Sequence, residues 1–183
     1  MALKSTIFKV ELSIADMDRH YYADHALTIA RHPSETDERM MVRVLAFVLH
    51  AHSNLAFGRG LSTEEEPDLW QRDLTGAVEK WIDVGLPDEQ DVRKACGRAP
   101  EVDVLAYGGR AVDLWWDGVR EKLARQPRLA VNEVPLEASK ALAGLAGRTM
   151  RLQASVQEGH VYVVDGTTSV AFELRPLKLR TAH

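Results

Sequence analysis

Apolar and polar residues alternate along the first thirty residues of the chain. Residues 5–14 place apolar side chains at every second position, with polar side chains between most of them. A period of two puts neighbouring side chains on opposite faces of a strand, so the pattern predicts a strand. A turn at 16–19 and a second strand at 21–31 follow. The start of the chain is therefore expected to be an antiparallel β-hairpin.

A dense apolar segment comes next, with the length and flanks of a helix. Pro33 ends the hairpin, and Ser34 with Asp37 forms a candidate N-terminal cap for a helix over about 35–53. The apolar residues of this segment are too closely spaced to occupy one face. We therefore expect a helix that is covered on two sides and packs against a sheet.

Strand and helix patterns then alternate, and the chain closes with strands. The predicted strands lie at 55–61, 67–72, 77–84, 102–107, 128–134, 150–156, 161–164 and 169–174, and the predicted helices at 87–97, 110–125 and 136–145. Helical connections allow parallel pairing of strands. The expected fold is mixed α/β: a single compact domain over 1–183, with one mixed β-sheet, flanking helices, an additional N-terminal hairpin and a C-terminal β-meander.

Composition narrows the protein class. The 183 residues are 45% hydrophobic and 27% charged, enough for one core and too few to argue for two domains. The formal net charge is −4, so nucleic-acid binding would need a local basic patch. Cys96 is the single cysteine, and the chain has neither a signal-like apolar core nor an apolar run of about eighteen residues. We expect a cytoplasmic protein without a membrane partner.

Acidic side chains gather on two of the predicted strands. Glu66 lies directly before the first of them, Asp68 lies within it, and Asp83 lies in the second. If Arg72 pairs with Ala77, opposing residue numbers sum to an odd number, and the three acids share one face of the sheet. A shift by one residue would move Asp83 to the other face.

This arrangement suits Mg²⁺ chemistry on phosphodiesters. Mg²⁺ is usually held by one or two carboxylates, with water and phosphate completing its shell. Asp68 and Asp83 are therefore candidate ligands, assisted by Glu66 and by the backbone carbonyl of Val84. Bound Mg²⁺ would polarise a phosphoryl oxygen and acidify an attacking water. Lys94, on the following helix, is the candidate cation that orients this water.

A structural interpretation of the same residues stays open. Residues 64–66 could form a solvated loop, and Asp83 could cap the turn before Pro87. Elsewhere, His25 and His32 could approach the acids, and Trp115 could stack on a base, but a satisfied histidine and a core aromatic are the favoured interpretations.

Four blocks of sequence resemble the YaeQ family of small bacterial proteins. They lie at 14–22, 25–36, 60–70 and 81–88, and the resemblance extends over essentially the whole chain. It implies a variant of the PD-(D/E)XK restriction-endonuclease-like fold. The motif's proline and first acid fall on Pro67 and Asp68, and its second acid falls on Asp83. Its lysine falls on Gly85, which has no side chain.

Two functional hypotheses follow. The first is a metal-dependent nuclease that cleaves phosphodiester bonds through Asp68 and Asp83, with Lys94 as the cation, Mg²⁺ as the cofactor and nucleic acid as the partner. The second is a non-catalytic module that binds nucleic acid or protein and keeps the nuclease-like fold without its lysine. Gly85 and the negative net charge favour the second hypothesis.

Overall fold

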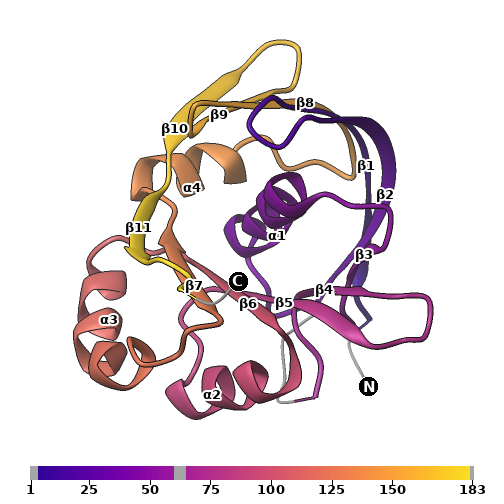
Figure 1. Ribbon diagram of the computed structural model, residues 1–183. Helices are drawn as coiled ribbons and strands as arrows, with labels where there is room; N and C mark the ends of the chain where they lie inside the picture. Colours follow the sequence, from indigo (N-terminus) through magenta and orange to yellow (C-terminus); the bar gives the residue numbers. More distant parts are fainter. Residues whose placement is uncertain (1–3, 60–64, 182–183) are drawn as a thin grey trace.

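Two β-sheets enclose the first helix of the chain, α1 (Asp37–His50), as Figure 1 shows. The structure is a computed structural model that describes residues 4–59 and 65–181. Helices α2 (Glu89–Arg98) and α3 (Arg110–Leu123) pack on one sheet, and α4 (Leu136–Ala143) lies beside α1. No helix in the described ranges is long and apolar enough to cross a membrane. The fold is mixed α/β as predicted, but two sheets replace the single expected one.

The first sheet unites the hairpin with the meander. Its five strands are β1 (Thr6–Asp16), β2 (Tyr21–Arg31), β8 (Thr149–Gln157), β9 (His160–Val164) and β10 (Ser169–Glu173). β1 and β2 form the predicted antiparallel hairpin, and β8, β9 and β10 form the predicted meander. β1 also pairs in parallel with β8, which gives the order β10-β9-β8-β1-β2. These segments are thus a sheet of their own and not additions to the other sheet.

The second sheet carries the acidic residues. Its strands, in the order β11-β7-β6-β5-β4-β3, are β3 (Leu55–Phe57), β4 (Leu69–Arg72), β5 (Val78–Val84), β6 (Glu101–Ala106), β7 (Leu129–Glu133) and β11 (Arg175–Lys178). β5, β6 and β7 are parallel because helices connect them. β11 is absent from the predicted strands, and its Pro176 is a residue that strands disfavour.

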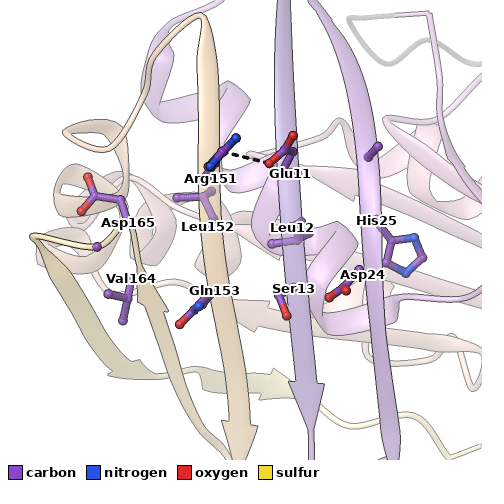
Figure 2. Close-up of a pocket in the computed structure, with 12 residues that line it drawn as sticks. Glu11, Leu12, Ser13, Asp24, His25, Arg151, Leu152, Gln153, Val164 and Asp165 are labelled. Carbon is purple, nitrogen blue, oxygen red and sulfur yellow. Dashed lines mark ion pairs between the residues drawn. The ribbon is translucent and has the colours of Figure 1, made fainter.

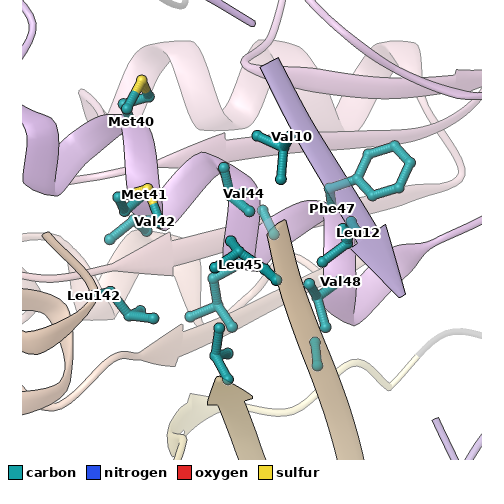
Figure 3. Close-up of a cluster of buried hydrophobic side chains, with 14 of the residues drawn as sticks. Val10, Leu12, Met40, Met41, Val42, Val44, Leu45, Phe47, Val48 and Leu142 are labelled. Atoms are coloured by element: carbon teal, nitrogen blue, oxygen red, sulfur yellow. The ribbon is translucent and has the colours of Figure 1, made fainter. Parts of the chain in front are cut away.

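Helix α1 is buried on both sides, as its apolar density predicts. Every residue from 40 to 48 is buried. Figure 3 shows its apolar side chains between Val10 and Leu12 of β1 and Leu142 of α4, and the same cluster includes Ile82 of β5. A helix that fills the space between two sheets leaves no solvated side for its polar residues. Any charged side chain in this stretch must therefore find a partner inside the protein.

The ends of two elements differ from those predicted. Helix α1 begins at Asp37, because Thr36 Oγ1 accepts a 3.0 Å hydrogen bond from the Arg39 amide. Ser34, the predicted cap, bonds to His32 Nδ1 instead, at 2.7 Å. The strand predicted at 55–61 ends at Phe57, residues 58 and 59 are not in a strand, and residues 60 and 61 lie outside the described ranges.

Candidate functional site

Asp68 and Asp83, the two predicted metal ligands, are neighbours at one end of the β4–β5 pair. The ladder pairs Leu69 with Ile82, and its next step places Asp68 opposite Asp83. Opposing residue numbers therefore sum to an odd number at the acids, as predicted. The predicted parity is the property that brings the two residues together.

The register near the turn differs from the one predicted. Arg72 pairs with Val78 and not with Ala77, and a bulge separates this pair from the pair of Gln71 with Lys80. A bulge adds one residue to one strand of a pair. The sum of opposing numbers is even at Arg72 and odd beyond the bulge, so the acids still face each other.

The two carboxyl groups contact the backbone of the opposite strand. Asp68 Oδ2 accepts a 2.8 Å hydrogen bond from the Val84 amide, and Asp83 Oδ1 lies 3.4 Å from the Asp68 amide. At this end of the strand pair, the two carboxyl groups accept hydrogen bonds from backbone amides in place of backbone carbonyl oxygens. The structure brings together Asp68, Asp83 and the Val84 peptide, which are three of the predicted site residues.

Asp83 is a buried carboxyl group whose described hydrogen-bond donors are neutral. It is 5% exposed, and its Oδ2 accepts a 3.1 Å hydrogen bond from Trp81 Nε1. Burial raises the pKa of Asp83, and the negative charge of Asp68 raises it further, to about 7. Near neutral pH, this carboxyl group is therefore divided between its protonated and ionised forms.

Asp68 is held by a cation from helix α1. It is 0% exposed, and Arg39 Nη2 donates a 2.7 Å hydrogen bond to its Oδ1. Burial raises the pKa of Asp68, while the Arg39 charge and the Val84 amide act in the opposite direction. Both oxygens of Asp68 thus accept hydrogen bonds from protein donors.

The ion pair continues into helix α1. Arg39 Nη1 donates to Glu35 Oε2 at 2.7 Å, and Arg43 binds both oxygens of Glu35, at 2.6 and 2.9 Å. Arg43 is 1% exposed. We refer to Glu35, Arg39, Arg43, Asp68 and Asp83 as the buried charge network. It contains three carboxyl groups and two guanidinium groups.

The sequence analysis missed three members of this network. Glu35, Arg39 and Arg43 lie in or just before the apolar helix, where they read as ordinary helix residues. Arg43 offered a signal, because it interrupts a stretch from 40 to 48 that is otherwise apolar. An arginine there must be buried, and a buried arginine requires an acid.

The ligand atoms that these residues offer are of the type that a hard divalent cation binds. Two carboxylates and a peptide carbonyl are oxygen ligands of the type that Mg²⁺ prefers. A cation at Asp68 Oδ1 would have to replace Arg39. Over the ranges that the structure describes, no three His, Cys, Asp or Glu side chains are arranged to hold a metal. The residues therefore permit a site with two carboxylates that peptide oxygen and water complete.

The remaining predicted site residues have other surroundings. Glu66 Oε1 accepts a 2.9 Å hydrogen bond from the Arg59 amide, and the Arg59 side chain lies 3.4 Å from Oε2. Lys94 is exposed on α2, and its role stays a prediction. Glu64, in the acidic segment, lies outside the described residues. Asp88, and not Asp83, caps the helix that follows β5.

Gly85 adopts a backbone conformation that suits glycine. Its φ angle is +97°, and its amide donates a 2.9 Å hydrogen bond to the Leu105 carbonyl. A side chain is strained at this φ whatever space surrounds it. A Cβ atom at Gly85 would lie 3.9 Å from Tyr107 Cε1. The position that the resemblance assigns to lysine is thus one where the backbone disfavours any side chain.

A hollow of about 700 Å³ lies on the first sheet, away from the acids (Figure 2). It extends over β1, β2 and β8, and Glu11 forms a 3.0 Å ion pair with Arg151 at its rim. The acids lie on the second sheet. The hollow therefore does not contain the predicted site.

The other candidate side chains make structural contacts. His25 Nε2 lies 2.7 Å from the Tyr21 hydroxyl, and its ring packs edge-on against Phe47. Trp115 Nε1 donates a 2.8 Å hydrogen bond to the Pro87 carbonyl, and the ring packs on the apolar cluster beneath α2 and α3. These contacts agree with the structural interpretation of each residue.

Comparison with known proteins gives consistent matches over most of the chain. A family model described as YaeQ protein matches residues 1–174. The proteins "Uncharacterized protein YaeQ" of Salmonella typhi and of Escherichia coli (strain K12) are 43% and 41% identical to the chain over 174 residues, which is 95% of this chain and 96% of each relative.

Solved structures agree with this result. The crystal structure of YaeQ protein from Xanthomonas axonopodis pv. citri has a TM-score of 0.91 at 48% identity, over 95% of this chain and 98% of that one. The YaeQ protein from Pseudomonas syringae has a TM-score of 0.90 at 37% identity, over 94% and 96% of the two chains. Sequence and structure together show that the chain belongs to the YaeQ family.

Proposed function

We propose that this protein is a metal-dependent phosphodiester hydrolase with a PD-(D/E)XK-like site at Asp68 and Asp83. The charge balance of the buried charge network carries the proposal. Three carboxyl groups face two guanidinium groups, and the pKa of Asp83 is raised to about 7. A divalent cation between Asp68 and Asp83 would supply the missing positive charge and favour the ionised form of Asp83.

Each proposed ligand is held in place by the strands. The Val84 amide orients the Asp68 carboxylate, and Trp81 Nε1 orients that of Asp83. Asp68, Asp83 and the Val84 carbonyl would hold Mg²⁺, with Glu66 assisting. Mg²⁺ bound there would polarise a phosphoryl oxygen and increase the acidity of a bound water. Nucleic acid is the proposed substrate class, and Lys94 is the proposed cation that orients the attacking water.

A second candidate function is a non-catalytic module that binds nucleic acid or protein. The observation that favours it is the saturation of Asp68, which is fully buried and accepts hydrogen bonds from Arg39 and Val84. The strained position for lysine at Gly85 agrees with it. In this candidate the buried charge network fixes α1 to the β4–β5 pair and has no chemical role.

Metal binding separates the two candidates. Mn²⁺ titration by calorimetry, and Mg²⁺- or Mn²⁺-dependent cleavage of labelled single- and double-stranded DNA and RNA, should be compared in the wild type, Asp68→Asn and Asp83→Asn. The hydrolase proposal expects both substitutions to abolish Mn²⁺ binding and cleavage. A folded wild type that neither binds Mn²⁺ nor cleaves would leave the second candidate.

Asp103→Asn is the matched control. Asp103 is also a buried aspartate on this sheet, is 6% exposed and is paired with Arg180 at 2.7 Å. Its substitution should disturb the protein to a similar degree and leave Mn²⁺ binding and cleavage intact. Cleavage that persists in Asp68→Asn would come from another site or from a contaminant.

A further inference from the structure

The guanidinium group of Arg39 is hydrogen-bonded to Asp68 Oδ1, the oxygen that a metal ion would need as a ligand. Its Nη2 lies 2.7 Å from Asp68 Oδ1, and its Nη1 lies 2.7 Å from Glu35 Oε2. The Arg39 side chain is 15% exposed, whereas those of Asp68 and Glu35 are 0% exposed. Arg39 therefore lies between the buried acids and the protein surface.

We propose that Arg39 is the substrate-phosphate cation of this site. Without metal it neutralises Asp68, and when a metal takes Asp68 the guanidinium turns to the phosphate of the substrate. This role rests on the proposed hydrolase function and assigns to Arg39 the task for which the PD-(D/E)XK motif uses a lysine.

The hydrogen bonds of the network allow Arg39 to move and hold Arg43 in place. Arg43 binds both oxygens of Glu35 and also the Ala30 carbonyl at 3.0 Å, and it is almost completely buried. Arg39 makes one side-chain hydrogen bond to each of two acids. If Arg39 leaves, Glu35 keeps Arg43 as its partner, and the metal compensates Asp68. No buried carboxylate then loses its counter-charge, which is the main cost of breaking a buried ion pair.

The position that the motif assigns to lysine lies beside Tyr107. The Tyr107 ring is 3.9 Å from the point that a Gly85 Cβ would occupy. Burial raises the pKa of Tyr107, and the positive charge of Arg39 opposes this rise. The backbone at position 85 disfavours a lysine, and the cation that contacts Asp68 comes from helix α1 instead.

An arginine suits this task chemically. A guanidinium can donate two parallel hydrogen bonds to a phosphate, and it stays charged at any physiological pH. Donors directed at the oxygens where charge develops lower the barrier of phosphoryl transfer. The same group that neutralises Asp68 in the metal-free protein is therefore equipped to neutralise the substrate.

The test uses opposite effects on metal binding and on cleavage in the full-length protein. Arg39→Ala removes the competitor at Asp68 Oδ1, so Mn²⁺ should bind roughly tenfold more tightly by calorimetry. Cleavage should fall about a hundredfold, since the phosphate loses its cation. Arg39→Lys should restore part of the cleavage. A dinucleotide phosphorothioate should bind the Mn²⁺-loaded wild type and should bind Mn²⁺-loaded Arg39→Ala much more weakly.

Arg180→Ala is the control, because Arg180 forms an equivalent ion pair with buried Asp103. It should change neither Mn²⁺ affinity nor cleavage. If Asp68→Asn abolishes Mn²⁺ binding while Arg39→Ala and Arg39→Lys leave it unchanged or weaker, Arg39 is structural and this inference fails alone. If neither the wild type nor any Arg39 variant binds Mn²⁺, the hydrolase proposal fails as well. If Arg39→Ala does not fold, Arg39→Gln, which also removes the positive charge, takes its place in both comparisons.

Discussion

Gly85 has a φ angle of +97°, and this conformation accounts for glycine at the position that the PD-(D/E)XK resemblance assigns to a lysine. The Gly85 amide bonds to the Leu105 carbonyl, so the backbone there is fixed by the neighbouring strand. Non-glycine residues are strained at this φ. The way in which β5 ends therefore favours glycine at this position.

Substitutions at this position should destabilise the protein. Gly85→Ala and Gly85→Lys should each lower the free energy of unfolding by about 1–2 kcal/mol, measured by urea denaturation. Gly118→Ala in α3 is the control, because an added Cβ there meets no atom within 4 Å and its φ is not in the left-handed region. This control should raise stability by up to about 1 kcal/mol. A neutral Gly85→Ala would show that the backbone relaxes there.

Asp83 should make the stability of the protein depend on pH. Its pKa is raised to about 7 in the folded state, above that of an unfolded chain. The contribution of such a group is fully present below the unfolded pKa and is lost as the pH rises through about 7. Between pH 6 and pH 8 the contribution of Asp83 to the free energy of unfolding of the metal-free protein should fall by about 1 kcal/mol.

Asp83→Asn removes this contribution, so the change in its free energy of unfolding from pH 6 to pH 8 should be about 1 kcal/mol more positive than that of the wild type, as measured by urea denaturation at several pH values. Asp103→Asn should keep the slope of the wild type. Equal slopes for the wild type and Asp83→Asn would contradict a raised pKa at Asp83.

At the scale of elements, helix α1 links the core to the site. Its apolar side chains fill the space between the two sheets, and Arg39 and Arg43 connect it to Asp68 and Glu35. Burial of a whole helix leaves its arginines dependent on a few acids. Glu35, just before the helix, is the acid that both of them share.

Removal of Glu35 should therefore be costly. Glu35→Ala leaves Arg43, which is 1% exposed, without its carboxylate partner, and should lower the free energy of unfolding by about 3–5 kcal/mol. Arg151→Ala is the comparison, because its ion pair with Glu11 is exposed and should contribute less than about 1 kcal/mol. Urea denaturation measures both. Similar losses of free energy of unfolding in the two variants would mean that the buried ion pair stabilises the protein no more than the exposed one.

At the scale of the whole molecule, the C-terminal segment fastens the edge of the second sheet. β11 pairs with β7 beyond residue 174, where the family match ends. Arg180 then donates to Asp103 Oδ2 at 2.7 Å, to the Val102 carbonyl at 3.1 Å and to the Arg128 carbonyl at 2.9 Å. One side chain thus ties the end of the described chain to β6 and to the start of β7.

Arg180→Ala should loosen this edge and leave the rest of the fold intact. Asp103 is 6% exposed and would lose its cation, so stability should fall by about 1–3 kcal/mol. Hydrogen exchange should become faster for the β11 amides, with little change in α1. Uniform acceleration over both sheets would instead indicate that the segment supports the whole molecule.

Local pattern determined most of the elements of this protein. Period-two alternation predicted the hairpin, and strand patterns predicted the segments that carry Asp68 and Asp83, although it is the bulge at Arg72 that restores the odd sum and sets the two acids opposite each other. These features depend on residues that are close together in sequence, so the sequence alone contains the information that determines them. Two-sided burial of α1 followed in the same way from its density of apolar residues.

Contacts between distant segments decided the rest. The parallel pairing of β1 with β8 creates a second sheet, and the pairing of β11 with β7 places a proline-containing segment in a strand. Arg39 pairs with Asp68 although the two residues lie far apart in sequence, because helix α1 packs against β4. Sequence fixes which side chains carry charge, but which charges meet in a buried space depends on how the helices and sheets pack.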